Sequence, residues 1–204
     1  MQAYMKSEMP FLGVPTAPLR AICKECFAGV EWRDSAQWHD EVRAIWNGAE
    51  HREERYAAIE LAKHKSARPF QALEALPLYS EMIVTGAWWD LVDNIAPSLV
   101  FGLLKTEREA MSETLRQWAR DDDIWLRRSA IIAQLQAKRQ TDLALLYDCI
   151  EPSMDSKEFF LRKAIGWALR QYARTDPAEV ARYVSANAER LSPLSKREAL
   201  KHIV

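Results

Sequence analysis

The stretch DSKEFFLRKAIGWALRQYA, residues 155–173, decides the fold class of this chain. Its apolar residues Phe159, Ile165 and Leu169 fall near one stripe of a helix with 3.6 residues per turn. A glycine inside a helix costs about 1 kcal/mol relative to alanine, so Gly166 indicates that another part of the molecule approaches closely there. The segment therefore predicts an amphipathic helix with a tightly packed neighbour.

Nearly every other segment has the same helical period, and none shows the alternating pattern of a β-strand. Asp176 followed by Pro177 is a typical helix start, and Ser195 with Glu198 has the spacing of a capping box. Pro97 is expected to kink or split the helix that contains it. The predicted helices are 17–28, 36–47, 51–65, 69–78, 79–86, 88–104, 107–120, 124–138, 142–150, 156–173, 177–188 and 195–203.

These helices predict an all-α fold. About a dozen short helices with tight links favour stacked antiparallel pairs, and pairs that recur at roughly 35 to 45 residues are typical of a HEAT-like α-solenoid. Such solenoids curve, and their concave face is the usual binding surface. Because no long linker interrupts the chain, residues 1–204 are predicted to form a single domain.

The composition is that of an ordinary globular protein, with 49% hydrophobic and 28% charged residues. No run of 18 apolar residues predicts a membrane span, and the N-terminus lacks the pattern of a signal peptide. Cys23, Cys26 and Cys149 are the sparse set expected in a reducing cytoplasm. We therefore predict a cytoplasmic protein without membrane association.

The net charge of −1 hides an uneven distribution. Residues 124–204 hold 14 Lys and Arg against 9 Asp and Glu, a net charge of +5, whereas residues 1–123 have a net charge of −6. A basic half beside an acidic half can mark a surface that binds DNA. The alternative is that solvent-exposed helices differ in charge by chance.

The sequence gives no sign of a metal or a nucleotide cofactor. Cys23 and Cys26 are spaced like a pair of zinc ligands, but Cys149 and the scattered histidines do not supply a second pair at suitable spacing. Neither a P-loop nor a G-x-G-x-x-G motif occurs. We therefore expect no metal and no cofactor.

The stretch TGAWWDLVDNIAP, residues 85–97, places two tryptophans beside two aspartates. In a helix Trp89 and Asp93 share one face, whereas Leu91 and Ile95 belong to the side that faces the core. An exposed indole offers a π surface to a sugar or a cation, and a neighbouring carboxylate can stabilise a developing positive charge. The alternative is that the tryptophan packs in the core and the aspartate only faces water.

Two stretches in the basic half add further candidate residues. Arg127 and Arg128 lie early in the predicted helix 124–138, where their charge and the free N–H groups of a helix N-terminus suit a phosphate. Trp167 lies in KAIGWALRQYA, with Arg170 about one turn further along. Each of these features, taken singly, is more often structural than functional.

Together with YMKSEMPFLGVP and LSPLSKREALKHI, these stretches resemble the bacterial AlkD-type DNA alkylation repair proteins, which are DNA glycosylases built from HEAT-like repeats. The similarity runs from about residue 4 to the C-terminus, in the same order and with similar spacing. Members usually carry another helical segment before the tyrosine of Y-M-K. The leading helical segment of the family is therefore expected to be absent from this chain.

The resemblance implies a role for each candidate residue. Trp89 and Asp93 match the tryptophan and the second aspartate of W-W-D-x-V-D, which line the lesion site in the family. Trp167 matches the tryptophan of A-I-G-W, and these three are the candidate catalytic residues. The candidate DNA-binding residues, led by the phosphate-holding arginine of I-W-L-x-R, are Arg128, its neighbour Arg127, Arg170 and Tyr4.

The same resemblance implies a monofunctional glycosylase that removes positively charged purines, chiefly 3-methyladenine and 7-methylguanine, from double-stranded DNA without flipping the base. Asp93 would oppose positive charge on the deoxyribose, while Trp89 and Trp167 would lie against the sugar. The expected partner is alkylated double-stranded DNA, bound on the concave face of the HEAT-like α-solenoid, and the protein is expected to act as a monomer. The alternative is a non-catalytic HEAT-like scaffold that binds DNA or a protein partner.

Overall fold

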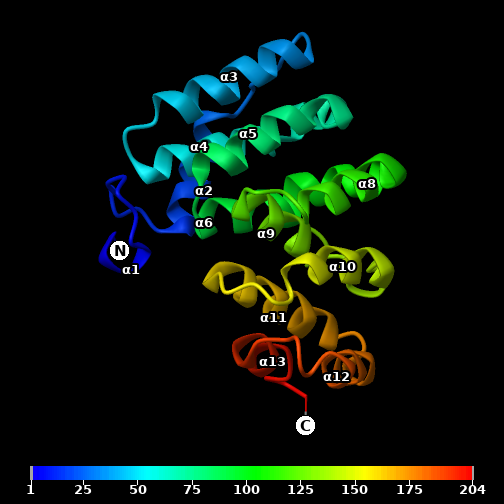
Figure 1. Cartoon of the computed structure of the whole chain (residues 1–204). Helices are drawn as coiled ribbons and strands as arrows, with labels where there is room; N and C mark the ends of the chain where they lie inside the picture. Colours follow the sequence, from blue (N-terminus) through cyan, green and yellow to red (C-terminus); the bar gives the residue numbers. More distant parts are fainter. Residues whose placement is uncertain (1, 204) are drawn as a thin grey trace. The chain divides into compact units, whose positions relative to one another are not determined.

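The computed structural model describes residues 2–203, which form α-helices joined by short 3-10 and π turns, with no β-strand in that range (Figure 1). The predicted all-α fold class is confirmed. The chain divides into two compact units, unit 1 (Met1–Ile95) and unit 2 (Ala96–Val204). Helices of a solenoid contact only their neighbours along the chain, so such a division is compatible with one domain, and the single-domain assignment stays a prediction.

Unit 1 packs its helices as stacked pairs, with α4 packed against α2 and α3, and α6 packed against α4 and α5. Two 3-10 turns, η1 (Lys65–Phe70) and η2 (Leu73–Ala75), lead into α5. This order of contacts is the one expected for solenoid-like stacking. The helices are α1 (Gln2–Met5), α2 (Thr16–Cys26), α3 (Ser35–Gly48), α4 (Arg52–Ala62), α5 (Leu76–Gly86) and α6 (Trp89–Ile95).

Large aromatic side chains fill the core of unit 1. Trp38, Trp46 and Tyr79 are almost completely buried, and each such side chain contributes roughly 1.5–3 kcal/mol through the hydrophobic effect. The rings of Trp38 and Tyr79 meet edge to face, with centroids 6.4 Å apart. The indole N–H of Trp46 donates a 2.9 Å hydrogen bond to Oγ1 of Thr85. This bond fixes the end of α5, where the tryptophan–aspartate stretch begins.

Unit 2 is built around α11 (Phe159–Ala173), which packs against α9, α12 and α13. No helix within residues 2–203 has both the length and the apolar character needed to cross a membrane. The remaining elements are η3 (Ala96–Val100), α7 (Phe101–Thr106), α8 (Arg108–Trp118), α9 (Ile124–Ile132), η4 (Lys138–Gln140), α10 (Leu143–Ile150), η5 (Glu151–Ser153), α12 (Pro177–Ala186) and α13 (Pro193–Ala199).

The close approach predicted at Gly166 is confirmed. A Cβ atom at this position would lie 2.5 Å from Cβ of Glu198 and 2.9 Å from the backbone oxygen of Ser195. The hydroxyl of Ser195 also donates a 3.0 Å hydrogen bond to the backbone oxygen of Arg162. The backbones of α11 and α13 therefore pack directly against each other where glycine leaves room.

Prolines explain where the helices of the middle region begin and break. The predicted helix 69–78 is wrong, because α5 begins only at Leu76, with Pro77 in its first turn, where no N–H donor is needed. The predicted interruption at Pro97 is confirmed, since this residue lies within the π turn Ala96–Val100. Proline thus marks both boundaries, although only one was placed correctly from the pattern.

The aspartate cap of α12 was predicted correctly from the sequence, whereas the serine cap of α13 was not. The predicted cap at Asp176 is confirmed, and its carboxylate accepts a 2.9 Å hydrogen bond from the N–H of Glu179. The predicted cap at Ser195 is wrong, because α13 begins at Pro193 and Ser192 is its N-cap, which accepts from the N–H of Ser195. Proline suits the first helical position, so it sets the start one turn earlier.

Candidate functional site

A sharp turn between α5 and α6 aims Trp88 and Trp89. A Cβ atom on Gly86 would lie 3.1 Å from the ring of Trp46, so a side chain here would crowd the indole. Ala87 has a φ of 41°, in the left-handed region that residues other than glycine seldom adopt. The turn ends α5 and starts α6 at once, which fixes the directions of the residues that follow.

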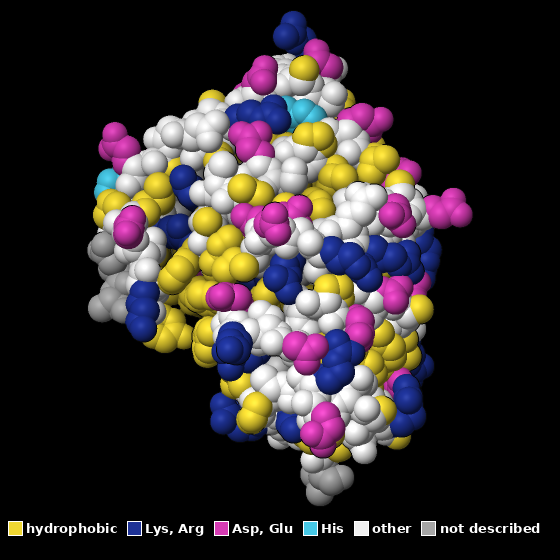
Figure 2. Space-filling view, viewed as in Figure 1, with side chains coloured by type: hydrophobic (Ala, Val, Ile, Leu, Met, Phe, Trp, Pro, Cys, Tyr) yellow, Lys and Arg dark blue, Asp and Glu magenta, His cyan; other side chains and the backbone are white. Residues whose placement is uncertain are grey.

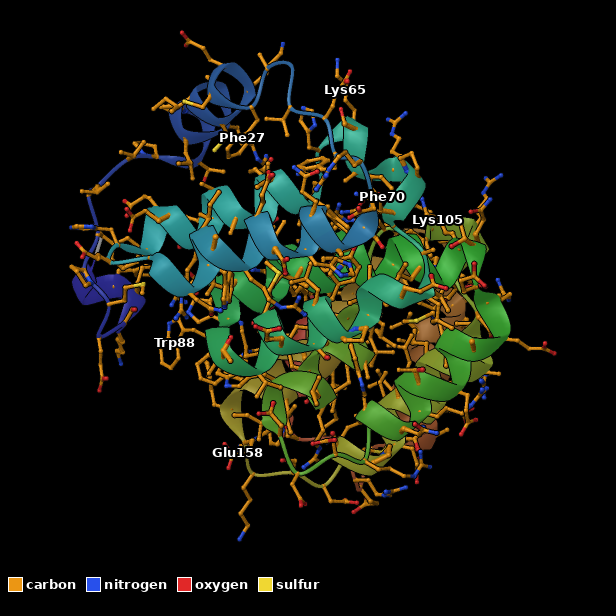
Figure 3. The ribbon with its side chains drawn as sticks, turned by 90° about the horizontal axis from the view of Figure 1, so that it is seen from above. Phe27, Lys65, Phe70, Trp88, Lys105 and Glu158 are labelled. Atoms are coloured by element: carbon orange, nitrogen blue, oxygen red, sulfur yellow. The ribbon has the colours of Figure 1, made fainter. Side chains whose placement is uncertain are left out.

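Trp88 attaches the N-terminal segment to this turn. Its indole N–H donates a 2.6 Å hydrogen bond to the backbone oxygen of Met5, and Figure 3 shows Trp88 beside α1. The side chain of Met5 is buried. The preceding residue, Tyr4, meets Trp89 edge to face, with 6.5 Å between ring centroids and 87° between ring planes. The segment around Tyr4 is therefore held against the start of α6.

A cleft of about 500 Å³ lies within unit 1 between α1, α2, α4 and α6. Tyr4, Trp89 and Asp93 all line it, so three of the predicted site residues share one cleft. Figure 2 shows hydrophobic side chains gathered on the surface between α1 and α6. A volume of this size is within the range of small-molecule sites. Trp89 is half-buried, so it is not a core residue.

The two aspartates of the stretch have different surroundings. The carboxylate of Asp90 accepts hydrogen bonds from Nε (3.0 Å) and Nη2 (2.5 Å) of Arg52, and one from the hydroxyl of Tyr56. The side chains of Arg52 and Asp90 are only 4% and 8% exposed, so they form a buried ion pair. Asp93 is half-buried and lines the cleft. Asp90 lines the same cleft, but its carboxylate is held by Arg52 and Tyr56.

Polar groups on the α4 side of the cleft are paired. Burial and the hydrogen bond to Asp90 raise the pKa of Tyr56 well above its usual value, so its hydroxyl keeps its proton and donates. Glu60 is paired with Arg20 at 3.4 Å and with Lys63 at 3.6 Å. Burial lowers the pKa of Lys63. The carboxylate of Glu60 is therefore neutralised by two nearby cations.

In unit 2, both candidate arginines of α9 make hydrogen bonds within the protein. Arg128 is 4% exposed, and its Nη1 donates a 2.6 Å hydrogen bond to the backbone oxygen of Phe160. Arg127 donates from Nε and Nη2 to the hydroxyl of Ser153, and from Nη2 to the backbone oxygen of Pro152. Their binding to phosphate stays a prediction.

The N-terminus of α9 differs from the expectation. Free N–H groups were predicted there, but the carboxylate of Asp123 accepts from the N–H of Trp125 at 2.7 Å and of Leu126 at 3.0 Å. The prediction of free N–H groups is wrong for these two residues, because an aspartate directly before the helix acts as its N-cap. The charge of a bound phosphate would have to be met by side chains instead.

Trp167 and Arg170 both belong to α11. Trp167 is half-buried. Arg170 forms an ion pair with Glu198 of α13, which also binds Nζ of Lys163 at 3.0 Å. The hydrogen bond from Lys163 is the main cause that holds the pKa of Glu198 below its usual value, and the charge of Arg170 adds to it. Glu198 therefore stays ionised at neutral pH and orients Arg170, whose side chain is 23% exposed.

The predicted residues thus fall into two sets. Unit 1 brings together Tyr4, Trp89 and Asp93 around one cleft. Unit 2 holds Trp167, Arg127, Arg128 and Arg170. Sequence reasoning missed Arg52 and Tyr56, whose partner Asp90 lies 38 and 34 residues away in the chain. A charged run at the start of a helix usually faces solvent, so no local signal identifies them.

The cysteines give no further site. Cys23 is buried and Cys26 is exposed, and both are free thiols. Burial raises the pKa of the Cys23 thiol, which makes its reactive thiolate form scarce. In the part of the chain that the structure describes, no three His, Cys, Asp or Glu side chains are placed to hold a metal ion.

Known proteins resemble this chain over its whole length. The sequence model of the DNA alkylation repair enzyme family matches residues 1–203. A solved structure described as a predicted DNA alkylation repair enzyme from Enterococcus faecalis is 29% identical, with a TM-score of 0.89 over 100% of this chain and 93% of that one. No curated protein matches the sequence. The chain therefore belongs to the DNA alkylation repair enzyme family, and its role lies in DNA repair.

Proposed function

We propose that the protein is a monofunctional DNA glycosylase. It would hydrolyse the N-glycosidic bond of positively charged alkylated purines, 3-methyladenine and 7-methylguanine, in double-stranded DNA. The observation that carries the proposal is the cleft shared by Trp89 and Asp93, with Tyr4 in contact with the Trp89 ring. An aromatic face next to a carboxylate suits a sugar on which positive charge develops.

The charge of the substrate explains why few catalytic groups are needed. A cationic base takes the bonding electrons as the bond to C1′ breaks, and it leaves as a neutral molecule. No general acid has to protonate it. The positive charge passes to the deoxyribose, which becomes oxocarbenium-like, and a water then adds to C1′ and loses a proton. The carboxylate of Asp93 opposes this charge and can orient the water.

Trp89 is assigned to the sugar. Its ring is half-buried and meets the edge of the Tyr4 ring at the cleft. The negative face of the indole also favours a cationic sugar. The base would stay in the helical stack, because the assigned residues address the sugar and the backbone. The roles of Trp167 at the sugar, and of Arg128, Arg127 and Arg170 at the DNA, rest on the family resemblance.

The test is the release of free 7-methylguanine from methylated double-stranded DNA. Asp93→Asn keeps the shape of the side chain and removes its charge, so excision should slow by on the order of 10²–10³, while DNA binding changes little. Asp40→Asn is the matched control, because Asp40 is exposed on α3 and does not line the cleft. Its excision rate should equal that of the wild type.

Two results would count against the proposal. Wild-type protein that binds methylated DNA but releases no base would favour the non-catalytic scaffold. Equal excision rates for Asp93→Asn and Asp40→Asn would remove the electrostatic role of Asp93. Binding itself should weaken as salt is added, because phosphate contacts release counterions. An affinity that does not depend on salt would favour a protein partner.

A further inference from the structure

Two buried charges stand side by side at the start of α4. Arg52 is 3% exposed and Glu53 is 2% exposed, so each is buried as a whole residue. Removing a charge from water costs several kcal/mol unless partners compensate for it. What these two residues bind therefore indicates why they are buried.

Glu53 binds the loop that follows α1. Its Oε2 accepts from the N–H of Leu12 at 3.0 Å, and its Oε1 accepts from Gly13 at 2.8 Å and Val14 at 3.1 Å. Gly13 has a φ of +85°, which bends the loop so that three successive N–H groups converge on one carboxylate. Hydrogen bonds to an ionised acceptor are roughly twice as strong as neutral ones, so this loop is firmly held.

Arg52 binds both the loop that follows α1 and helix α6. Its backbone N–H donates to the backbone oxygen of Pro10 at 2.9 Å, in the same loop that Glu53 holds. Its guanidinium binds Asp90 on α6, the residue next to Trp89. Tyr56, one turn further along α4, donates to the same carboxylate and lines the cleft.

These bonds join two of the walls of the cleft to a single helical turn. One wall is the segment 4–14, which contributes Tyr4 and Val14, and the other is α6, which contributes Trp89 and Asp93. We propose that Arg52 and Glu53 are positioning residues that set the width of the cleft. Neither lines the cleft, so they act through the residues that they hold. This inference rests on the proposed glycosylase function.

The test compares Glu53→Gln with Glu54→Gln. Glu54 lies in the same turn and also accepts backbone hydrogen bonds, from Glu50 at 2.6 Å and His51 at 2.7 Å, but it does not bind the loop. Both variants lose a carboxylate that accepts backbone hydrogen bonds in the first turn of α4, and only Glu53→Gln releases the loop of residues 12–14. Amide exchange of Leu12 to Val14 should rise at least about tenfold in Glu53→Gln alone, since local opening needs no global unfolding.

Activity provides the second readout. Glu53→Gln should lower kcat/KM for base release by about ten- to a hundredfold, mainly by raising KM, as expected for a loosened site. Glu54→Gln should stay within about twofold of the wild type at a temperature where both are folded. Gly13→Ala offers an independent route, because no atom lies within 4 Å of the new Cβ and only the φ of +85° opposes it. Gly13→Ala should raise both the amide exchange of residues 12–14 and the KM for base release, as Glu53→Gln does.

Unchanged amide exchange in both loop variants, Glu53→Gln and Gly13→Ala, would overturn the inference. A fall in activity that Glu54→Gln reproduces would also overturn it, since the effect would then be general instability. The exchange measurement does not need an active enzyme. If the wild type releases no base, the glycosylase proposal fails, while the exchange of residues 12–14 still decides whether Glu53 holds the wall.

Discussion

Replacing Gly166 with alanine should destabilise unit 2. The new methyl group would lie 2.5 Å from Cβ of Glu198 and 2.9 Å from the backbone oxygen of Ser195, and neither atom is the tip of a flexible side chain. Ordinary carbon contacts begin near 3.5 Å, so α13 must move by about 1 Å. Overpacking of this kind costs about 1–3 kcal/mol, and the better helix propensity of alanine returns up to about 1 kcal/mol. The expected net loss therefore lies between about 0 and 3 kcal/mol, and we expect a value near the middle of this range, about 1–2 kcal/mol.

Urea unfolding followed by far-UV circular dichroism measures this loss. Gly102→Ala is the matched control, because it makes the same substitution within a helix of the same unit and no atom lies within 4 Å of the added Cβ. It should stabilise the protein by about 0.4–1 kcal/mol. The two variants should therefore shift in opposite directions. If Gly166→Ala is at least as stable as the wild type, the close packing of α11 and α13 does not explain this glycine.

Two further predictions concern charged side chains. Arg52→Met leaves the buried Asp90 without its partner and should lower the free energy of unfolding by about 3–5 kcal/mol. Adding Asp90→Asn should recover at least about 1 kcal/mol of this loss. Strictly additive losses of the two substitutions in urea unfolding would contradict a coupled pair. Hydrogen bonds from Arg182 and then from Tyr147 lower the pKa of Glu179 to about 2. The stabilisation that ionised Glu179 gives to the folded protein is therefore complete above a pH of about 4.5 and is lost as the pH falls toward about 2. The stabilities of wild type and Glu179→Gln should differ at about pH 6 and converge on acidification, and a difference that grows would contradict the ion pair.

Local chemistry explains how much of the fold could be predicted from the sequence. Helical period and an aspartate before a proline act within a few residues, and the start of α12 at Pro177 was therefore found. The start of α13 was missed because Ser192 and Ser195 both have cap chemistry at adjacent turns. Gly166 signalled close packing, but the identity of the neighbour, α13, depends on the tertiary fold.

From the local pattern alone, the candidate site was predictable only where its residues share one helix, and Tyr4 was added by the family resemblance. Trp89 and Asp93 are four residues apart, so their common face follows from helix geometry. Glu53 and its loop partners are separated by 39 to 41 residues, and no pattern in one sequence joins them. REER at 52–55 reads as an ordinary solvated helix start, yet two of its members are buried. Buried charges are placed by tertiary contacts, which the local pattern does not contain.

The stretch WWDLVD combines two tasks that must be kept apart in mutagenesis. Trp88 directly precedes α6 and reaches Met5. Within α6 successive residues point about 100° apart, so Trp89 lies at the cleft, Asp90 reaches the guanidinium of Arg52, and Asp93 returns to the cleft. An inactive Asp90→Asn variant would therefore say nothing about chemistry, because the loss of a buried partner also lowers stability. Asp93→Asn changes a residue of the cleft wall at constant shape. Excision lost in that variant, with DNA binding and unfolding unchanged, separates catalysis from folding.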